Sequence, residues 1–160
     1  MLKRHFMLVV TAIAVLAGCA STSQPVLLAN TIAARPQLST LNGLIIKAGL
    51  TDTLKSAGPF TVFAPTNEAF AKVPAKTMEA LASDPAQLKA VLTYHVISGK
   101  VMLADVKNGN NKTVNGANVA LSRAGDFMTV EEALVQMPDI SALNGVVHIV
   151  DSVLLPPAKR

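Results

Sequence analysis

The chain has 160 residues, of which 51% are hydrophobic and 15% charged, with a formal net charge of +4. The lysines are scattered among carboxylates, and the chain has one tyrosine and no tryptophan. This composition offers neither a continuous basic stripe nor an aromatic stacking platform, so we expect no nucleic-acid partner. A single cysteine excludes an internal disulfide even in an oxidising compartment. The fold must therefore depend on the packing of an apolar core.

The N-terminal residues have the pattern of a bacterial lipoprotein signal. Two basic residues precede an apolar run over residues 8–17, which is too short to span a bilayer. Residues 16–19 read Leu-Ala-Gly-Cys, similar to the lipoprotein cleavage box. An ordinary secretory signal is the alternative, but a secreted protein has little use for one unpaired thiol. We expect residues 1–18 to be removed and Cys19 to be acylated, which makes the membrane a partner.

The acylated cysteine also predicts a location in the cell envelope. Two or three acyl chains anchor a protein stably, whereas one chain binds only marginally. Residue 20 is alanine, not the aspartate that often retains lipoproteins at the inner membrane, so the outer membrane is favoured in a Gram-negative cell. Residues 19–36 lack a sustained period and are typical of an anchor and tether. We expect one domain over residues 37–157 and a tail over residues 158–160.

The first half of the expected domain has helical patterns around one strand. Apolar residues recur at three- and four-residue spacing after residue 37, at Leu38, Leu41, Ile45 and Ile46, and Gly49 is expected to end the helix. A short second helix is expected over residues 51–56. Residues 60–63 are aromatic or β-branched, which predicts a buried strand. Thr66 can then cap a following helix through its hydroxyl.

The second half changes from helical spacing to a period of two. Asp84 followed by proline predicts the start of a helix. Strands are expected over residues 112–114 and 119–121, joined at an Asn-Gly turn, and over residues 127–130. Residues 146–150 are almost continuously apolar, which predicts a strand buried on both faces. Helices followed by strands indicate an α+β fold.

Three separated segments resemble one family when taken in order. They are TVFAPTNEAF at residues 61–70, YHVI at residues 94–97 and NGVVHIVDSVLLP at residues 144–156. Their order and spacing are similar to those of a single fasciclin (FAS1) domain, over about residues 37–157. The resemblance implies the FAS1 fold, a compact β-sandwich or wedge with several short α-helices packed along it. Asn67 stands where many members have aspartate, which preserves hydrogen bonding and loses the charge.

The resemblance also implies a non-catalytic binding module for cell adhesion or for contact with a matrix. Its partner would be a protein or a polysaccharide, and no cofactor is expected. The motifs of serine hydrolases, phosphate-binding loops and zinc peptidases are missing from the sequence. Two alternatives remain open. One is a structural or accessory lipoprotein that faces the periplasm, and the other is a small-ligand carrier with a pocket between the helices and the sandwich.

Four residues are candidates for partner contact. Asp139 and Ile140 match an Asp-Ile element through which some animal members are thought to bind integrins. Pro138 removes a backbone donor and favours an edge or loop, which would present the Asp139 carboxylate to solvent. Tyr94 and His95 lie in a second segment implicated in integrin binding in animal members. The alternative for each residue is a local structural role. For Asp139 this would be a place in a solvated turn, and Asp139→Ala is then expected to leave the melting temperature nearly unchanged.

His95 and His148 are the only histidines outside the expected signal peptide. They could be metal ligands or a proton-transfer pair, or each could satisfy a polar contact in the core. Two ligands without a placed third make a poor metal site. We therefore expect core roles, no metal and no catalytic residue, and we interpret Glu131-Glu132 as a solvated bend.

Overall fold

The computed structural model describes residues 26–157, so the expected signal peptide, Cys19 and the tail at residues 158–160 lie outside the described residues. The helices in this part of the chain are α1 (Leu28–Ala33), η1 (Pro36–Leu38), α2 (Ser39–Lys47), α3 (Thr51–Lys55), α4 (Asn67–Ala71), α5 (Ala75–Ser83), α6 (Pro85–Tyr94) and η2 (Leu103–Asp105). The strands are β1 (Phe60–Pro65), β2 (Val96–Ser98), β3 (Gly109–Lys112), β4 (Asn118–Ala124), β5 (Phe127–Val130), β6 (Ala133–Ala142) and β7 (Gly145–Val150).

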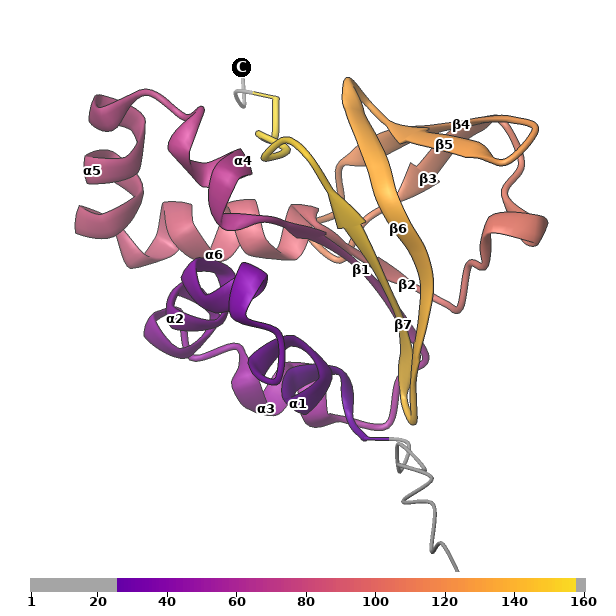
Figure 1. The fold of residues 1–160 in the computed structure, drawn as a ribbon. Helices are drawn as coiled ribbons and strands as arrows, with labels where there is room; N and C mark the ends of the chain where they lie inside the picture. Colours follow the sequence, from indigo (N-terminus) through magenta and orange to yellow (C-terminus); the bar gives the residue numbers. More distant parts are fainter. Residues whose placement is uncertain (1–25, 158–160) are drawn as a thin grey trace, which may run out of the picture.

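The strands form one mixed sheet in the order β2-β1-β7-β6-β5-β4-β3. β1 and β7 are parallel, and the other neighbouring pairs are antiparallel. An isolated bridge between Ile97 and Thr113 brings β2 back beside the end of β3, so the sheet almost closes on itself. Helices α1 to α6 lie on one side of β1 and β7, and β3, β4 and β5 fold over on the other, together with η2 (Figure 1). This wedge, with helices packed along it, confirms the predicted α+β fold.

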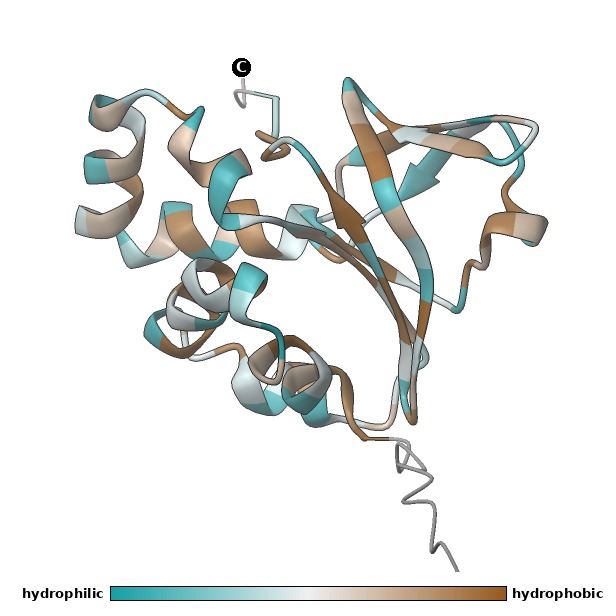
Figure 2. Cartoon of the chain, viewed as in Figure 1, coloured by the Kyte–Doolittle hydropathy of each residue, from teal (hydrophilic) through white to brown (hydrophobic). Residues whose placement is uncertain are grey.

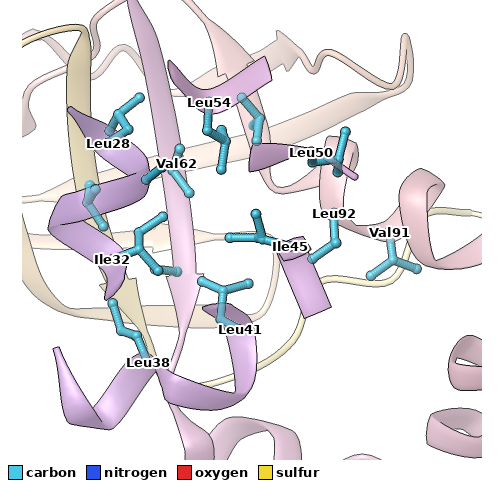
Figure 3. Packing of buried hydrophobic residues seen from close by; sticks show 14 of the residues in the cluster. Leu28, Ile32, Leu38, Leu41, Ile45, Leu50, Leu54, Val62, Val91 and Leu92 are labelled. Atoms are coloured by element: carbon cyan, nitrogen blue, oxygen red, sulfur yellow. The ribbon is translucent and has the colours of Figure 1, made fainter. Parts of the chain in front are cut away.

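The core lies on both sides of β7, every residue of which is buried. On the helix side, α1, α2, α3 and α6 pack against β1 and β7, as Figure 3 shows for Leu28, Ile32, Leu41, Ile45, Val62 and Leu92. On the other side, a second cluster fills the space between β1 and strands β4, β5 and β6. Figure 2 shows the matching hydropathy, with brown residues along β7. The prediction of a last strand buried on both faces is confirmed.

Two predicted helix caps are present. The Thr66 hydroxyl oxygen accepts from the backbone N–H of Ala69 over 3.2 Å at the start of α4. The Asp84 carboxylate accepts from the backbone N–H groups of Ala86 and Gln87 at the start of α6. Each cap satisfies amides of a first helical turn that otherwise have no partner.

The expected tether is wrong over its second half. Residues 28–33 form helix α1, and the side chains of Leu28 and Ile32 are 0% exposed in the helix-side core. Six residues are too few for a helical spacing of apolar residues to stand out from the irregular residues before them. Burial of the two large apolar side chains stabilises this short helix. The domain therefore begins before residue 37. In the same region Ile46, which the spacing placed on the apolar face of α2, is exposed.

Candidate functional site

The first candidate region is an irregularity in the pairing of β6 with β7. Met137 pairs with Ile149 and Ile140 with Val147, so two residues of β6 stand opposite His148 alone. Such a bulge leaves one backbone N–H without its usual strand partner. The N–H of Asp139 instead donates to Nδ1 of His148 over 3.1 Å. The histidine side chain therefore replaces a missing backbone acceptor.

The second nitrogen of His148 is also engaged. Nε2 lies 2.8 Å from the carbonyl oxygen of Val101 and donates to it, because Nδ1 is the acceptor for Asp139. The ring stacks on Phe63 with centroids 5.5 Å apart. Burial lowers the pKa of His148, while the Val101 carbonyl and the Asp139 carboxylate oppose that shift. His148 is thus a neutral core residue, as predicted.

Asp139 lies at an open edge of the sheet. β5 pairs with β6 only at Ala133 and Leu134, so among the described strands the remainder of β6 is paired on its β7 side alone. The edge that Pro138 predicted is therefore present. The Asp139 carboxylate is only half-exposed, however, because Oδ1 accepts from the N–H of Leu103 over 2.8 Å.

Asp139 also has a backbone φ of 58°, in the left-handed region that aspartate and asparagine tolerate better than most residues. Two local constraints thus act on this position, so Asp139→Ala is expected to lower stability, in contrast to the expectation from the sequence. Ile140 is half-buried against the helix-side core. It is not displayed beside the carboxylate, as the Asp-Ile element had suggested.

His95 lies at the end of α6 and is almost fully buried. Its Nδ1 donates to the carbonyl oxygen of Val91 over 2.8 Å, and its Nε2 accepts from the N–H of Leu154 over 3.0 Å. Burial lowers the pKa of His95 from 6.5 to about 4, against a smaller opposing effect of the Val91 carbonyl. His95 therefore fastens the C-terminal segment to α6 while remaining neutral.

Tyr94 is buried beside the turn between β5 and β6. Its hydroxyl lies 3.1 Å from the carbonyl oxygen of Asn118 and 3.3 Å from Oε1 of Glu131. The same Glu131 oxygen accepts from the N–H of Ala120 over 2.8 Å. Burial first, and then the nearby Glu131 charge, raise the pKa of Tyr94. The bend at Glu131 is thus a structural turn, and neither Tyr94 nor His95 presents its side chain to a partner in this conformation.

Neither histidine has a free lone pair in this arrangement, because the nitrogen that is not protonated already accepts a backbone N–H. Within residues 26–157, no three histidine, cysteine, aspartate or glutamate side chains are grouped so as to hold a metal ion. None of the helices in that range is long and apolar enough to cross a membrane.

Sequence reasoning missed Asn144, which is buried at the turn between β6 and β7. Its Nδ2 donates to the carbonyl oxygens of Leu54 and Ser56, over 2.7 and 2.8 Å. Its Oδ1 accepts from the N–H of Leu28 over 2.9 Å, and its backbone carbonyl accepts from Phe60. One side chain thus connects α1, α3 and the β6–β7 turn. The Asn-Gly pair signals a turn, but its partners are backbone atoms that no sequence motif identifies.

The expected pocket between the helices and the sheet is very small. The apolar cavity between α2, α3, α6 and β1 has a volume of about 20 Å³. That space suits about one water molecule. An open groove lies instead between η1, α4 and β6. Three amides, one hydroxyl, one carboxylate and one thioether line it: Gln37, Asn67, Gln136, Thr66, Glu68 and Met137. The cavity gives no support to a small-ligand carrier.

The Asn67 side chain holds the elements on two sides of this groove together. Its Nδ2 donates to the carbonyl oxygen of Pro36 over 3.0 Å, and its Oδ1 accepts from the N–H of Thr40 over 3.0 Å. An aspartate could make only the second of these contacts, since it has no donor when ionised. The amide at this position therefore connects α4 to η1 and the start of α2.

Comparison with known proteins agrees with this architecture. The Fasciclin domain model matches residues 36–156. The chain is 38% identical to Protein sll1483 of Synechocystis sp. over 140 residues, which cover 86% of this chain and 78% of that protein. It is 41% identical over 128 residues to the immunogenic protein MPB70 of Mycobacterium bovis, covering 77% of this chain and 65% of that protein.

Two further matches are a cell surface protein and a solved structure. The cell surface glycolipoprotein MPB83 of Mycobacterium bovis is 38% identical over 129 residues, which cover 78% of this chain and 58% of that protein. A solved FAS1 domain pair from the insect cell adhesion molecule Fasciclin I matches with a TM-score of 0.64 at 17% identity, over 81% of this chain and 51% of the solved one. That match concerns the fold alone. From the family model and these relatives, the chain belongs to the fasciclin domain family.

Proposed function

We propose that this chain is a lipid-anchored, non-catalytic binding module of the bacterial cell envelope. The observation that carries the proposal is the similarity, over 78% of this chain, to a cell surface glycolipoprotein. The lipoprotein cleavage box at residues 16–19 supports the same location from an independent part of the sequence. Acylation of Cys19 would supply the anchor, and the outer membrane is its proposed site in a Gram-negative cell.

The proposed activity is adhesion to a protein or a polysaccharide. Membership of the fasciclin family and similarity to a cell surface protein support adhesion. The histidines give no support to a catalytic role, since both are buried and engaged by backbone contacts. A general base needs hydrogen-bond access to a substrate proton, which neither ring has in this conformation. Many copies fixed in one membrane would give avidity even where a single domain binds weakly.

We propose the open edge of β6 at Asp139 as the contact surface. A half-exposed carboxylate at a bulge offers a fixed negative group beside an unpaired strand edge. The bulge and Pro138 also disfavour simple addition of another strand to this edge. Contact through the side chain, rather than through an added strand, is therefore the proposed mode.

Protease treatment of intact cells tests the location and role together. A surface adhesin is cut by protease added outside the cell, and the same cells lose attachment to an immobilised matrix polymer or to one another. Cys19→Ser, which removes the acylation site, should release the protein from the envelope and abolish attachment. Protection from protease with unchanged attachment would contradict the proposal and favour an accessory role in the periplasm.

A further inference from the structure

The described chain begins at one end of the molecule, beside the tip of the β6–β7 hairpin and the end of α3 (Figure 1). We call this the basal end and define it as Val26, residues 55–59 and residues 141–144. The backbone carbonyl of Val26 accepts from the N–H of Leu143 over 3.0 Å, so the two residues are adjacent. The Asn144 side chain bonds to Leu54 and Ser56 and holds the α3 end beside them.

The basal end is apolar at its surface. Leu143 is 63% exposed and Val26 is 40% exposed, although they touch through their backbones. Residues 55–59 are all exposed and consist of a lysine, a serine, an alanine, a glycine and a proline. Lys55 is thus the one charged side chain in residues 55–59 and 141–144. An exposed leucine beside a valine, with a flanking lysine, has the composition of a membrane-interface contact. The nearest exposed carboxylate in the sequence is Asp52, one turn before Lys55 in α3.

Val26 of the basal end lies only a few residues after Cys19 in the sequence, which places the basal end near the proposed lipid anchor. Seven residue steps separate Cys19 from Val26, and whatever their conformation they span at most about 25 Å. If Cys19 is held in the membrane, the basal end must lie close to the lipid headgroups. The C-terminal end of β7 lies at the opposite end of the molecule (Figure 1). The tether is therefore short enough to restrict which end of the domain meets the bilayer.

We propose that the basal end docks on the bilayer that holds the lipid anchor, with Leu143 entering the boundary between headgroups and acyl chains. This inference rests on the proposed acylation of Cys19 and adds a fixed orientation to it. Lys55 faces anionic headgroups in this arrangement. Docking in this orientation turns the β4–β5 hairpin away from the lipid (Figure 1).

The absence of tryptophan from the chain allows a direct test. The mature acylated protein carrying Leu143→Trp is reconstituted into phosphatidylcholine–phosphatidylglycerol vesicles, with and without lipids brominated along their acyl chains. The matched control is Phe127→Trp at the β4–β5 hairpin, because Phe127 is 69% exposed and Leu143 is 63% exposed. Val26→Trp is a second reporter at the basal end, and circular dichroism verifies that each variant is folded.

The expected result is that Trp at positions 143 and 26 shifts its emission to the blue and loses most of its intensity with brominated lipids. Trp at position 127 should show neither change. Unquenched emission from both basal reporters would overturn the inference, as would equal quenching at position 127.

Flotation of the same vesicles separates the inference from the anchor on which it rests. Wild-type protein should float with the vesicles and Cys19→Ser should not. Flotation of wild-type protein with unquenched basal reporters would leave the anchor in place and refute the docking. Equal flotation of Cys19→Ser would refute the anchor itself.

Discussion

The side-chain Oδ1 of Asn144 accepts a hydrogen bond from the backbone N–H of Leu28 over 2.9 Å, across 116 residues of sequence. This bond fixes the first turn of α1 to the turn before β7. Because the two donors of the same amide are bound to Leu54 and Ser56, the side chain is fully used in a buried position. The chain therefore begins its folded domain at α1 and not at residue 37.

Asn144→Ala should lower the free energy of unfolding by about 3 kcal/mol, because it leaves the Leu28 N–H and two carbonyl oxygens without their partner. Asn144→Asp should also destabilise the domain, since it keeps the acceptor for Leu28 but points a carboxylate at two carbonyl oxygens. Urea-induced unfolding measures both changes. Asn42→Ala in α2 is the control and should change stability by less than about 0.5 kcal/mol. An equally small effect at Asn144 would show that the three bonds contribute little.

Gly145→Ala should prevent folding or destabilise it severely. A Cβ at this position would overlap the carbonyl oxygen of Phe60, and backbone atoms cannot yield as a flexible side chain can. Gly43→Ala is the matched control, because a Cβ there meets nothing within 4 Å and Gly43 lies inside helix α2. That substitution should stabilise the protein by about 0.5–1 kcal/mol. Thermal unfolding of the two variants should move in opposite directions, and a normal melting temperature for Gly145→Ala would contradict the close approach.

Asp139→Asn and Asp139→Ala should differ in stability. Asparagine keeps an acceptor for the Leu103 N–H and tolerates the left-handed φ of 58°, so its free energy of unfolding should change little. Alanine loses the acceptor and tolerates that φ poorly, which should cost about 1–3 kcal/mol. Urea-induced unfolding of both variants checks the difference. Equal stability of the two would mean that neither the bond nor the backbone conformation matters.

Stability should fall as the pH drops from about 6.5 toward about 4. The pKa of His95 is lowered to about 4 in the folded state from 6.5 in the unfolded state, so only the unfolded chain binds a proton in this interval. The neutral His95 ring contributes fully to the free energy of unfolding above pH 6.5. Lowering the pH to about 4 removes on the order of 3 kcal/mol of that contribution. The lowered pKa of His148 acts in the same direction.

Unfolding free energies measured across this pH interval test whether stability falls on acidification. His95→Gln should be less stable at neutral pH, where it loses the fitted imidazole, but should show a flatter pH dependence. Stability of the wild-type chain that is constant or that rises on acidification would contradict the neutral, buried state of the ring.

Much of the fold could be predicted from the sequence, because a helix cap needs a particular side chain at one position and a buried strand needs a run of apolar residues. Thr66 and Asp84 cap helices for the reasons visible in the sequence, and the apolar run at residues 146–150 is buried. The bulge at Asp139 was not predictable in the same way, since Pro138 indicates an edge but carries no information on strand register. The role of Asn144 was hidden for a related reason, because its partners are backbone groups brought together only by the fold.

Attachment of the source organism's cells and of candidate matrix polymers to the immobilised mature protein decides between a binding function and its absence. Wild-type protein is compared with Asp139→Asn, which removes the charge and keeps the local hydrogen bond, and with Asp126→Asn at the exposed β4–β5 turn. We expect saturable attachment that is lost with Asp139→Asn and retained with Asp126→Asn. Attachment to no surface would contradict the binding function, and equal attachment by all three proteins would contradict the β6 edge as its contact surface.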